Sequence, residues 1–173
     1  MDDLTIRPAT AEDAGAIGRI YDDAIAGGIA TFATGPHTAE ERRGWLAARP
    51  PRAPVWCGTI DGTPVAWSAL APFSHRHWYD GVGEYTVYVA SGQARRGLGQ
   101  RMLTALIEAA PALGYWKLVG MILADNPAGL ALAQRAGCTV VGTHRAHARR
   151  DGRWRDVTIV ERHLAPPHDH DGA

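Results

Sequence analysis

A carboxylate, a strand-like segment and a glycine-rich turn follow one another between residues 84 and 99. Residues 86–89 (Thr-Val-Tyr-Val) are β-branched or aromatic and favour a strand, whereas the apolar residues after Gly97 recur at helical spacing. The turn between them contains Arg95 and Arg96. A strand that passes through such a turn into a helix offers free backbone N–H groups, a positive dipole end and nearby cations. The segment therefore predicts a phosphate-binding site, with Glu84 at its entrance.

The details of this turn restrict which phosphate it can hold. It lacks the Gly-Lys-Ser/Thr ending of a nucleoside-triphosphate loop, and so lacks that loop's lysine and magnesium ligand. It also lacks Gly-x-Gly-x-x-Gly, because its glycines stand at positions 92, 97 and 99. A pyrophosphate held by backbone N–H groups, with Arg95 and Arg96 nearby, fits better.

A second group of polar residues precedes the Glu84 strand. The segment 72–79 contains His75, Arg76, His77 and Tyr79. Arginine suits an anionic substrate, and histidine titrates near neutral pH. The segment is either a plain polar loop or a substrate-facing one, and the residues alone leave both open.

Composition indicates an ordinary globular chain. Of 173 residues, 46% are hydrophobic and 21% are charged, and the formal net charge is zero. This balance favours neither nucleic acid nor a membrane surface as a partner. Cys57 and Cys138 form no Cys-x-x-Cys pair and the N-terminus is acidic, so we expect reduced thiols and a cytoplasmic protein. We expect no metal site, because His168 and His170 near the C-terminus lack further ligands.

Periodicity and turn signals predict the element order β-α-α-β-β-β-α-β-α-β-β. Asp61-Gly62 and Asp151-Gly152 indicate hairpins, and Thr10 and Thr38 are expected N-caps. This order favours an α/β (α+β) mixed sheet with helices on both faces. We expect one domain over residues 1–164 and a disordered tail over 165–173. Phe32 is expected either in a pocket or as an apolar plug, and Trp154 in the core.

These motifs resemble the GNAT superfamily of N-acetyltransferases, whose acetyl-CoA motif is a strand, then Arg/Gln-x-x-Gly-x-Gly/Ala, then a helix. Within it, the chain is similar to the phosphinothricin N-acetyltransferase family, including the branch that acetylates arsinothricin. The similarity covers residues 4–164, and the segments that carry it are Ala30–Phe32, Glu84–Val89, Tyr115–Val119 and Asp151–Arg162. It implies the GNAT fold, with a mostly antiparallel sheet, and a homodimer.

The resemblance also implies roles for individual residues. Acetyl-CoA is the implied co-substrate, without a metal. Its pantetheine arm is expected along Val87, Tyr88 and Val89, and Asn126 is expected near its thiol end. The residues expected to hold the pyrophosphate are Ala94, Arg95, Arg96, Gly97, Leu98 and Gly99. Those expected to bind the substrate are Phe32, His75, Arg76 and Tyr79.

Two positions depart from the family pattern. The motif's first Arg/Gln corresponds to Ala94, with Gln93 one place away. We expect acetyl-CoA binding to be retained despite this change, because the motif binds the pyrophosphate mostly through backbone groups. A histidine or tyrosine on the following helix of many relatives corresponds to Ala133. Three possibilities therefore remain for protonation of the departing thiolate. The proton comes from Tyr88, or from a water molecule, or no dedicated acid is used.

The chemistry implied for this family requires a base. An ammonium group has no lone pair to attack a thioester, so a proton must first be removed from the substrate amine. Glu84 matches the family's catalytic glutamate, and burial beside aromatic residues would raise its pKa toward a useful value. A backbone N–H near Val87–Val89 is the expected donor to the thioester oxygen as it gains charge.

We expect acetylation of the α-amine of phosphinothricin or arsinothricin, which would give resistance to these antimetabolites. One alternative is a general acetyltransferase of small amino acids such as methionine sulfone or methionine sulfoximine. Another, from a different class, is a non-catalytic acyl-CoA-binding module, suggested by Ala133. Acetylation of a protein N-terminus or lysine fits less well, because the Arg76 loop indicates a small anionic substrate.

Overall fold

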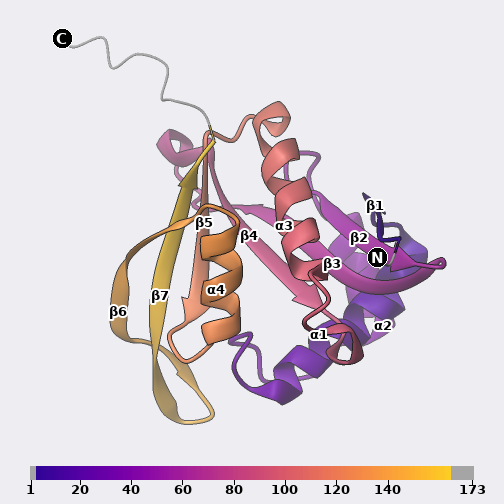
Figure 1. Ribbon diagram of the computed structural model, residues 1–173, viewed down its shortest axis with the longest axis horizontal. Coiled ribbons are helices and arrows are strands. Elements are labelled where there is room, and N and C mark those ends of the chain that lie inside the picture. Colours follow the sequence, from indigo (N-terminus) through magenta and orange to yellow (C-terminus); the bar gives the residue numbers. More distant parts are fainter. Residues whose placement is uncertain (1–2, 165–173) are drawn as a thin grey trace.

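The computed structural model describes residues 3–164, which form one mixed sheet covered by helices (Figure 1). The helices are α1 (Ala14–Gly27), α2 (Ala39–Ala47), α3 (Leu98–Ala109) and α4 (Pro127–Arg135). The strands are β1 (Thr5–Pro8), β2 (Val55–Ile60), β3 (Thr63–Pro72), β4 (Val82–Val89), β5 (Lys117–Leu123), β6 (Thr139–Arg150) and β7 (Arg153–His163). The predicted order of helices and strands is confirmed, with short 3-10 turns between some of them.

The seven strands lie in the order β1-β2-β3-β4-β5-β7-β6, and β4 and β5 are the parallel pair. That pairing is short. It runs from Val82 opposite Lys117 to Glu84 opposite Val119. Beyond this point β4 continues to pair only with β3, and β5 only with β7. The sheet therefore splits along its middle, leaving one open edge on each of the two strands.

Local caps fix where the first two helical segments begin. Thr38 accepts a hydrogen bond from the Glu41 backbone N–H at 3.1 Å, and the Glu41 carboxylate accepts one from the Thr38 N–H at 2.7 Å. Thr10 and Asp13 form the same reciprocal box before α1. These boxes satisfy N–H groups that a helix start leaves unpaired, which is why both threonines could be identified as caps from sequence.

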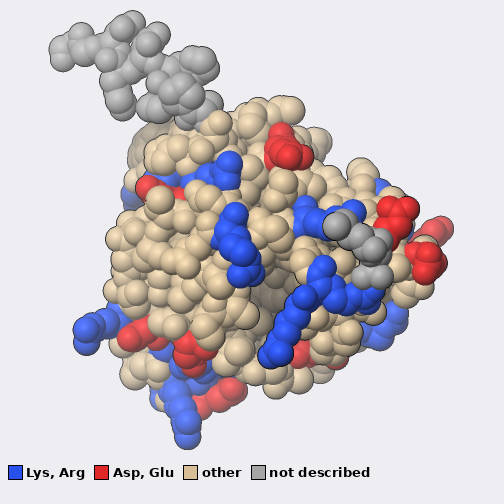
Figure 2. Space-filling model, in the orientation of Figure 1, with Lys and Arg blue, Asp and Glu red and all other residues tan. Residues whose placement is uncertain are grey.

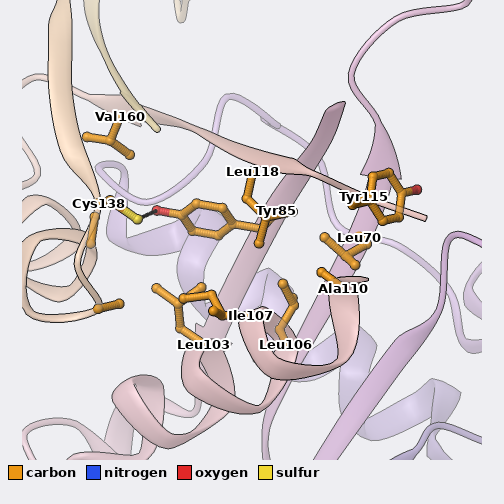
Figure 3. Packing of buried hydrophobic residues seen from close by; sticks show 12 residues of the cluster. Leu70, Tyr85, Leu103, Leu106, Ile107, Ala110, Tyr115, Leu118, Cys138 and Val160 are labelled. Carbon is orange, nitrogen blue, oxygen red and sulfur yellow. Dashed lines mark hydrogen bonds between the residues drawn. The ribbon is translucent and has the colours of Figure 1, made fainter. Parts of the chain in front are cut away.

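Each face of the sheet has its own helix pair and core. On one face α1 and α2 cover β3 and β4, with Ile17, Ile20 and Trp67 buried between them. On the other face α3 and α4 pack over a larger cluster (Figure 3). There Tyr85 extends from β4 toward Cys138, with its hydroxyl 4.0 Å from the Cys138 sulfur. Burial raises the pKa of both groups.

Some expectations need correction or fall outside the described part of the chain. The prediction that Trp154 lies in the core is wrong, because its side chain is 65% exposed and lies beneath the Arg149 guanidinium on the β6–β7 hairpin. The predicted tail, with His168 and His170, lies outside the described residues, and the boundary at residue 164 stays a prediction. Within residues 3–164, no helix is long and apolar enough to span a membrane.

Candidate functional site

The open edges of β4 and β5 border a narrow cavity of about 80 Å³. Side chains from β4, β5, α4 and the loop after α1 line it: Ala30, Phe32, Tyr85, Thr86, Val87, Tyr88, Gly120, Met121, Ile122, Leu123, Asn126, Gly129 and Leu132. An extended ligand can pair with such an unpaired strand edge as an additional strand would. Val87 and Tyr88 line this cavity and Val89 does not, so a linear arm along all three residues stays a prediction. We call this space the strand cavity.

The turn after β4 presents backbone N–H groups rather than a side-chain cap. Gly97 is the N-cap of α3, with φ of 77°, and no side chain caps the helix. Arg95 also has positive φ, at 64°. The first N–H groups of α3 have no acceptor within the helix and carry the positive end of its dipole. This arrangement fits a pyrophosphate.

The side chains of this turn divide into exposed and buried ones. Arg95 and Arg96 are exposed, and Arg96 donates a hydrogen bond to the Gln93 side-chain oxygen. Leu98 is buried in the core, so only its backbone can face a ligand. A Cβ built at Gly99 would lie 3.4 Å from the Leu132 side chain and 3.5 Å from that of Val89. The start of α3 therefore lies close to β4. Figure 2 shows basic side chains gathered near this end of α3, beside a hollow in the surface.

Glu84 lies on the opposite face of β4 from Tyr85. Glu84, Thr86 and Tyr88 alternate along the strand and share one side, which lines a second cavity of about 230 Å³. We call it the Glu84 cavity; its other lining residues are Tyr21, Arg42, Trp45, Arg49, Trp67, Ala69, Leu70 and Ala71. Burial without a compensating cation raises the pKa of Glu84. This is the shift that a general base for an amine needs.

Thr86 and Tyr88 line both cavities. The space for a linear arm and the space around Glu84 therefore meet at β4. The Tyr88 ring lies between Trp67 and Tyr21, with ring centroids 4.8 Å and 5.0 Å away, and burial raises the pKa of its hydroxyl. Tyr88 thus remains a candidate donor to a thiolate held at this junction.

Asn126 lies just before α4 and Ala133 within it. Asn126 is the N-cap and lines the strand cavity, and its side-chain oxygen accepts a hydrogen bond from the Gly129 N–H at 2.9 Å. Its side-chain N–H₂ group remains available to a ligand. Ala133 is fully buried against the core. It offers no acid, as its sequence indicated.

The expected substrate residues do not come together. Phe32 lines the strand cavity, and Arg150 secures its loop by donating hydrogen bonds to the carbonyl oxygens of Thr31 at 2.8 Å and Ile25 at 2.6 Å. His75, Arg76 and Tyr79 are exposed and line neither cavity. Their loop starts at the end of β3, where Pro72 pairs with Gly83, next to Glu84. They lie beside the site rather than in it.

Sequence reasoning missed the residues that line the Glu84 cavity from α2 and from the segment just after it. Arg42, Trp45 and Arg49 line the Glu84 cavity. Arg42 is 6% exposed and Arg49 is partly buried. The spacing i, i+3 places Arg42 and Trp45 on one side of α2, whereas Arg49 lies two residues beyond the end of this helix. Arginine and tryptophan on the same helical stripe were the signal that could have found them.

The comparisons with known proteins agree with this geometry. Residues 17–138 match the model of the Acetyltransferase (GNAT) family. A phosphinothricin N-acetyltransferase of Streptomyces viridochromogenes is 33% identical over 95% of this chain and 91% of its own length. An L-methionine sulfoximine/L-methionine sulfone acetyltransferase of Pseudomonas paraeruginosa is 31% identical over 94% and 95%. A structure from Salmonella typhimurium with its cofactor acetyl-CoA superposes with a TM-score of 0.90 at 26% identity, covering 98% of this chain and 99% of that one.

Proposed function

Since this chain belongs to the GNAT family of acetyltransferases, we propose that it acetylates the α-amine of phosphinothricin-like amino acids. Phosphinothricin and arsinothricin are the substrates we expect, and acetyl-CoA is the acetyl donor. The observation that supports this most is the position of Glu84. It is a partly buried carboxylate with a raised pKa, in a cavity that adjoins the open strand edges.

Acetyl-CoA supplies the activated thioester, and the protein's residues supply positioning and proton transfer. The α3 start and the turn 94–99 suit its pyrophosphate, and the β4 edge suits its arm. Glu84 accepts a proton from the ammonium group, directly or through water, so that the amine can attack. A backbone N–H of β4 at Val87–Val89 stabilises the charge that grows on the thioester oxygen.

Several finer features belong to the same proposal. Arg76 flanks the entrance together with His75 and Tyr79, and the positive charge of Arg76 attracts the acidic substrate. Both cysteines are free and buried, which supports action in the reducing cytoplasm.

The exposed aromatic residues Phe73, Trp78 and Trp116 support a homodimer, because aromatic side chains are enriched where chains meet. One relative acts on methionine sulfoximine and methionine sulfone, and these are the runner-up substrates.

A substrate panel tests the proposal. Purified protein with acetyl-CoA is given phosphinothricin, arsinothricin, methionine sulfone and a lysine peptide in parallel, and thiol release is followed. We expect the largest kcat/KM with the two acidic analogues and none with the peptide. Faster turnover of methionine sulfone would favour a general amino-acid acetyltransferase. If the protein binds acetyl-CoA but acetylates none of these amines, the result would favour the non-catalytic acyl-CoA-binding module.

A further inference from the structure

Arg42 is a buried cation with two donor atoms that are unpaired among the described residues. It is 6% exposed, and its guanidinium carbon lies 4.5 Å from the Tyr21 ring centroid and 5.3 Å from that of Trp45. Its Nε and Nη2 are shielded from solvent and have no hydrogen-bond partner among residues 3–164. No carboxylate of these residues forms an ion pair with it. Leaving a buried charge without a partner is costly, so such a group is expected to meet a ligand.

Two other arginines show what a structural role looks like in this fold. Arg150 is buried to the same degree, yet it donates to two backbone carbonyl oxygens. Arg49 lines the same cavity as Arg42, but it donates to the carbonyl oxygens of Ala53 and Leu70. Arg42 makes no such bond. Its donors remain available on the wall of the Glu84 cavity.

A second unpaired donor lines the same cavity. The indole N–H of Trp67 is buried, with no hydrogen-bond partner in the described part of the chain. Trp67 and Trp45 pack edge to face, with ring centroids 5.8 Å apart. These rings form an apolar part of the cavity lining, and a lower local dielectric strengthens a charged interaction. Arg42 on α2 and Trp67 on β3 therefore bring two donors without a hydrogen-bond partner among residues 3–164 to one cavity, which suits an oxyanion.

We propose that Arg42 binds an oxyanion of the amino-acid substrate in the Glu84 cavity. The oxyanion is the α-carboxylate or the acidic group of the side chain, and both present the oxygen pair that a guanidinium fork matches. Holding this group on the α2 wall directs the amine toward β4, where Glu84 and the strand cavity meet. The inference rests on the proposed function, because it concerns the same site. It makes Arg42 a determinant of substrate specificity.

Four amines test which group Arg42 recognises. Phosphinothricin carries both acids, methionine sulfone only the α-carboxylate, 3-aminopropyl(methyl)phosphinic acid only the side-chain acid, and 3-(methylsulfonyl)propylamine neither. Each is titrated calorimetrically into wild-type protein, Arg42→Gln and Arg42→Lys with CoA present. The control is Arg43→Gln, which removes the same charge from the next, exposed residue of α2. Thermal unfolding and acetyl-CoA affinity establish that each variant is folded.

For Arg42→Gln we expect affinity for phosphinothricin to fall by roughly 10- to 100-fold, the range for a charged hydrogen bond, with little change in Arg43→Gln. An equal fall for methionine sulfone assigns Arg42 to the α-carboxylate; a fall for the phosphinic acid instead assigns it to the side-chain acid. The compound with neither group should bind equally weakly to all forms. Unchanged affinity for both phosphinothricin and methionine sulfone overturns the inference.

Binding and turnover are read separately, so the inference and the proposed function fail in different ways. If wild-type protein acetylates none of the four amines, the proposed function fails, while calorimetry still reports on Arg42. If Arg42→Gln does not fold, Arg42→Lys serves as the test variant. It retains the positive charge but lacks the paired N–H donors of the guanidinium group. A wild-type protein that binds phosphinothricin no better than 3-(methylsulfonyl)propylamine also overturns the inference, because neither acid would then be recognised.

Discussion

Two carboxylates of this chain, Asp13 and Glu84, have pKa values that move in opposite directions. The Arg7 guanidinium donates to both oxygens of Asp13, at 2.7 Å and 2.8 Å, and this lowers the pKa of Asp13 to about 2. Glu84 has no such partner, and burial raises its pKa. Asp13 is thus held as an anion that supports the fold, whereas Glu84 is placed to exchange a proton.

Replacing Asp13 by Asn should destabilise the fold in a pH-dependent way. At pH 7 we expect a loss of about 1–3 kcal/mol in the free energy of unfolding, because Arg7 loses a charged partner. The folded pKa of Asp13 is depressed, so its contribution is present above the unfolded value of about 4 and disappears as pH falls toward about 2. Urea unfolding at several pH values measures this, with exposed Asp3→Asn as the control. A deficit that stays constant from pH 7 to 2 would contradict the assignment.

Residues of the site differ in how far sequence could predict them. Glu84 was predictable because its motif is contiguous and lies in a recognisable strand, β4. Arg42 was not, since charged residues on a short helix usually face solvent. Only the packing of α2 against α1 and β3 turns this arginine inward. For the Arg76 loop the sequence misleads in the opposite direction. Its residues have types suited to binding a substrate, but they are exposed and lie beside the Glu84 cavity.

At the scale of elements, the start of α3 is set by two left-handed residues. Gly97 has φ of 77° and Arg95 has φ of 64°. Without a capping side chain, the helix leaves its first N–H groups open toward the turn. We therefore propose that the glycine's role is conformational and that the residues around it bind the pyrophosphate through their backbone. This explains how Ala94 can stand where relatives carry a longer side chain.

Gly97→Ala should weaken acetyl-CoA binding and lower stability. A residue with a Cβ in the left-handed region costs about 1–2 kcal/mol, and relief of this strain would rotate the N–H groups away from a pyrophosphate. Calorimetry with acetyl-CoA and thermal unfolding measure the two effects. Gly92→Ala is the matched control, since Gly92 lies in the same turn without a positive φ and with open space around it. Equal acetyl-CoA affinity in both variants would argue against a backbone cradle at Gly97.

For the whole molecule, the split between β4 and β5 decides where function can lie. The order of the elements was predictable, because hairpin turns, caps and periodicity are local signals. The split was not, since it depends on how far two strands distant in sequence stay paired. The exposure of Trp154 escaped prediction for the same reason, because the β6–β7 hairpin lies at the edge of the sheet, where most of β6 is exposed.

The two cavities meet only because both faces of β4 are used. Tyr85 faces the α3 side, while Glu84, Thr86 and Tyr88 face the Glu84 cavity. A thioester arm along the open edge and an amine near Glu84 would then approach each other at Thr86 and Tyr88. Bringing two reactants together in this way lowers the entropic barrier to their reaction. The central claim is that Glu84 removes the proton at this meeting point.

The kcat of Glu84→Gln as a function of pH tests that claim most directly, with Glu108→Gln on the exposed side of α3 as the control. With phosphinothricin, we expect kcat to fall by about two to four orders of magnitude in Glu84→Gln. Affinity for acetyl-CoA should be retained, because Glu84 lies outside the strand cavity. In wild-type protein, kcat should rise with pH through a pKa above that of an ordinary glutamate, since burial raises it and the base must be ionised. A Glu84→Gln enzyme with wild-type kcat at every pH would contradict the account.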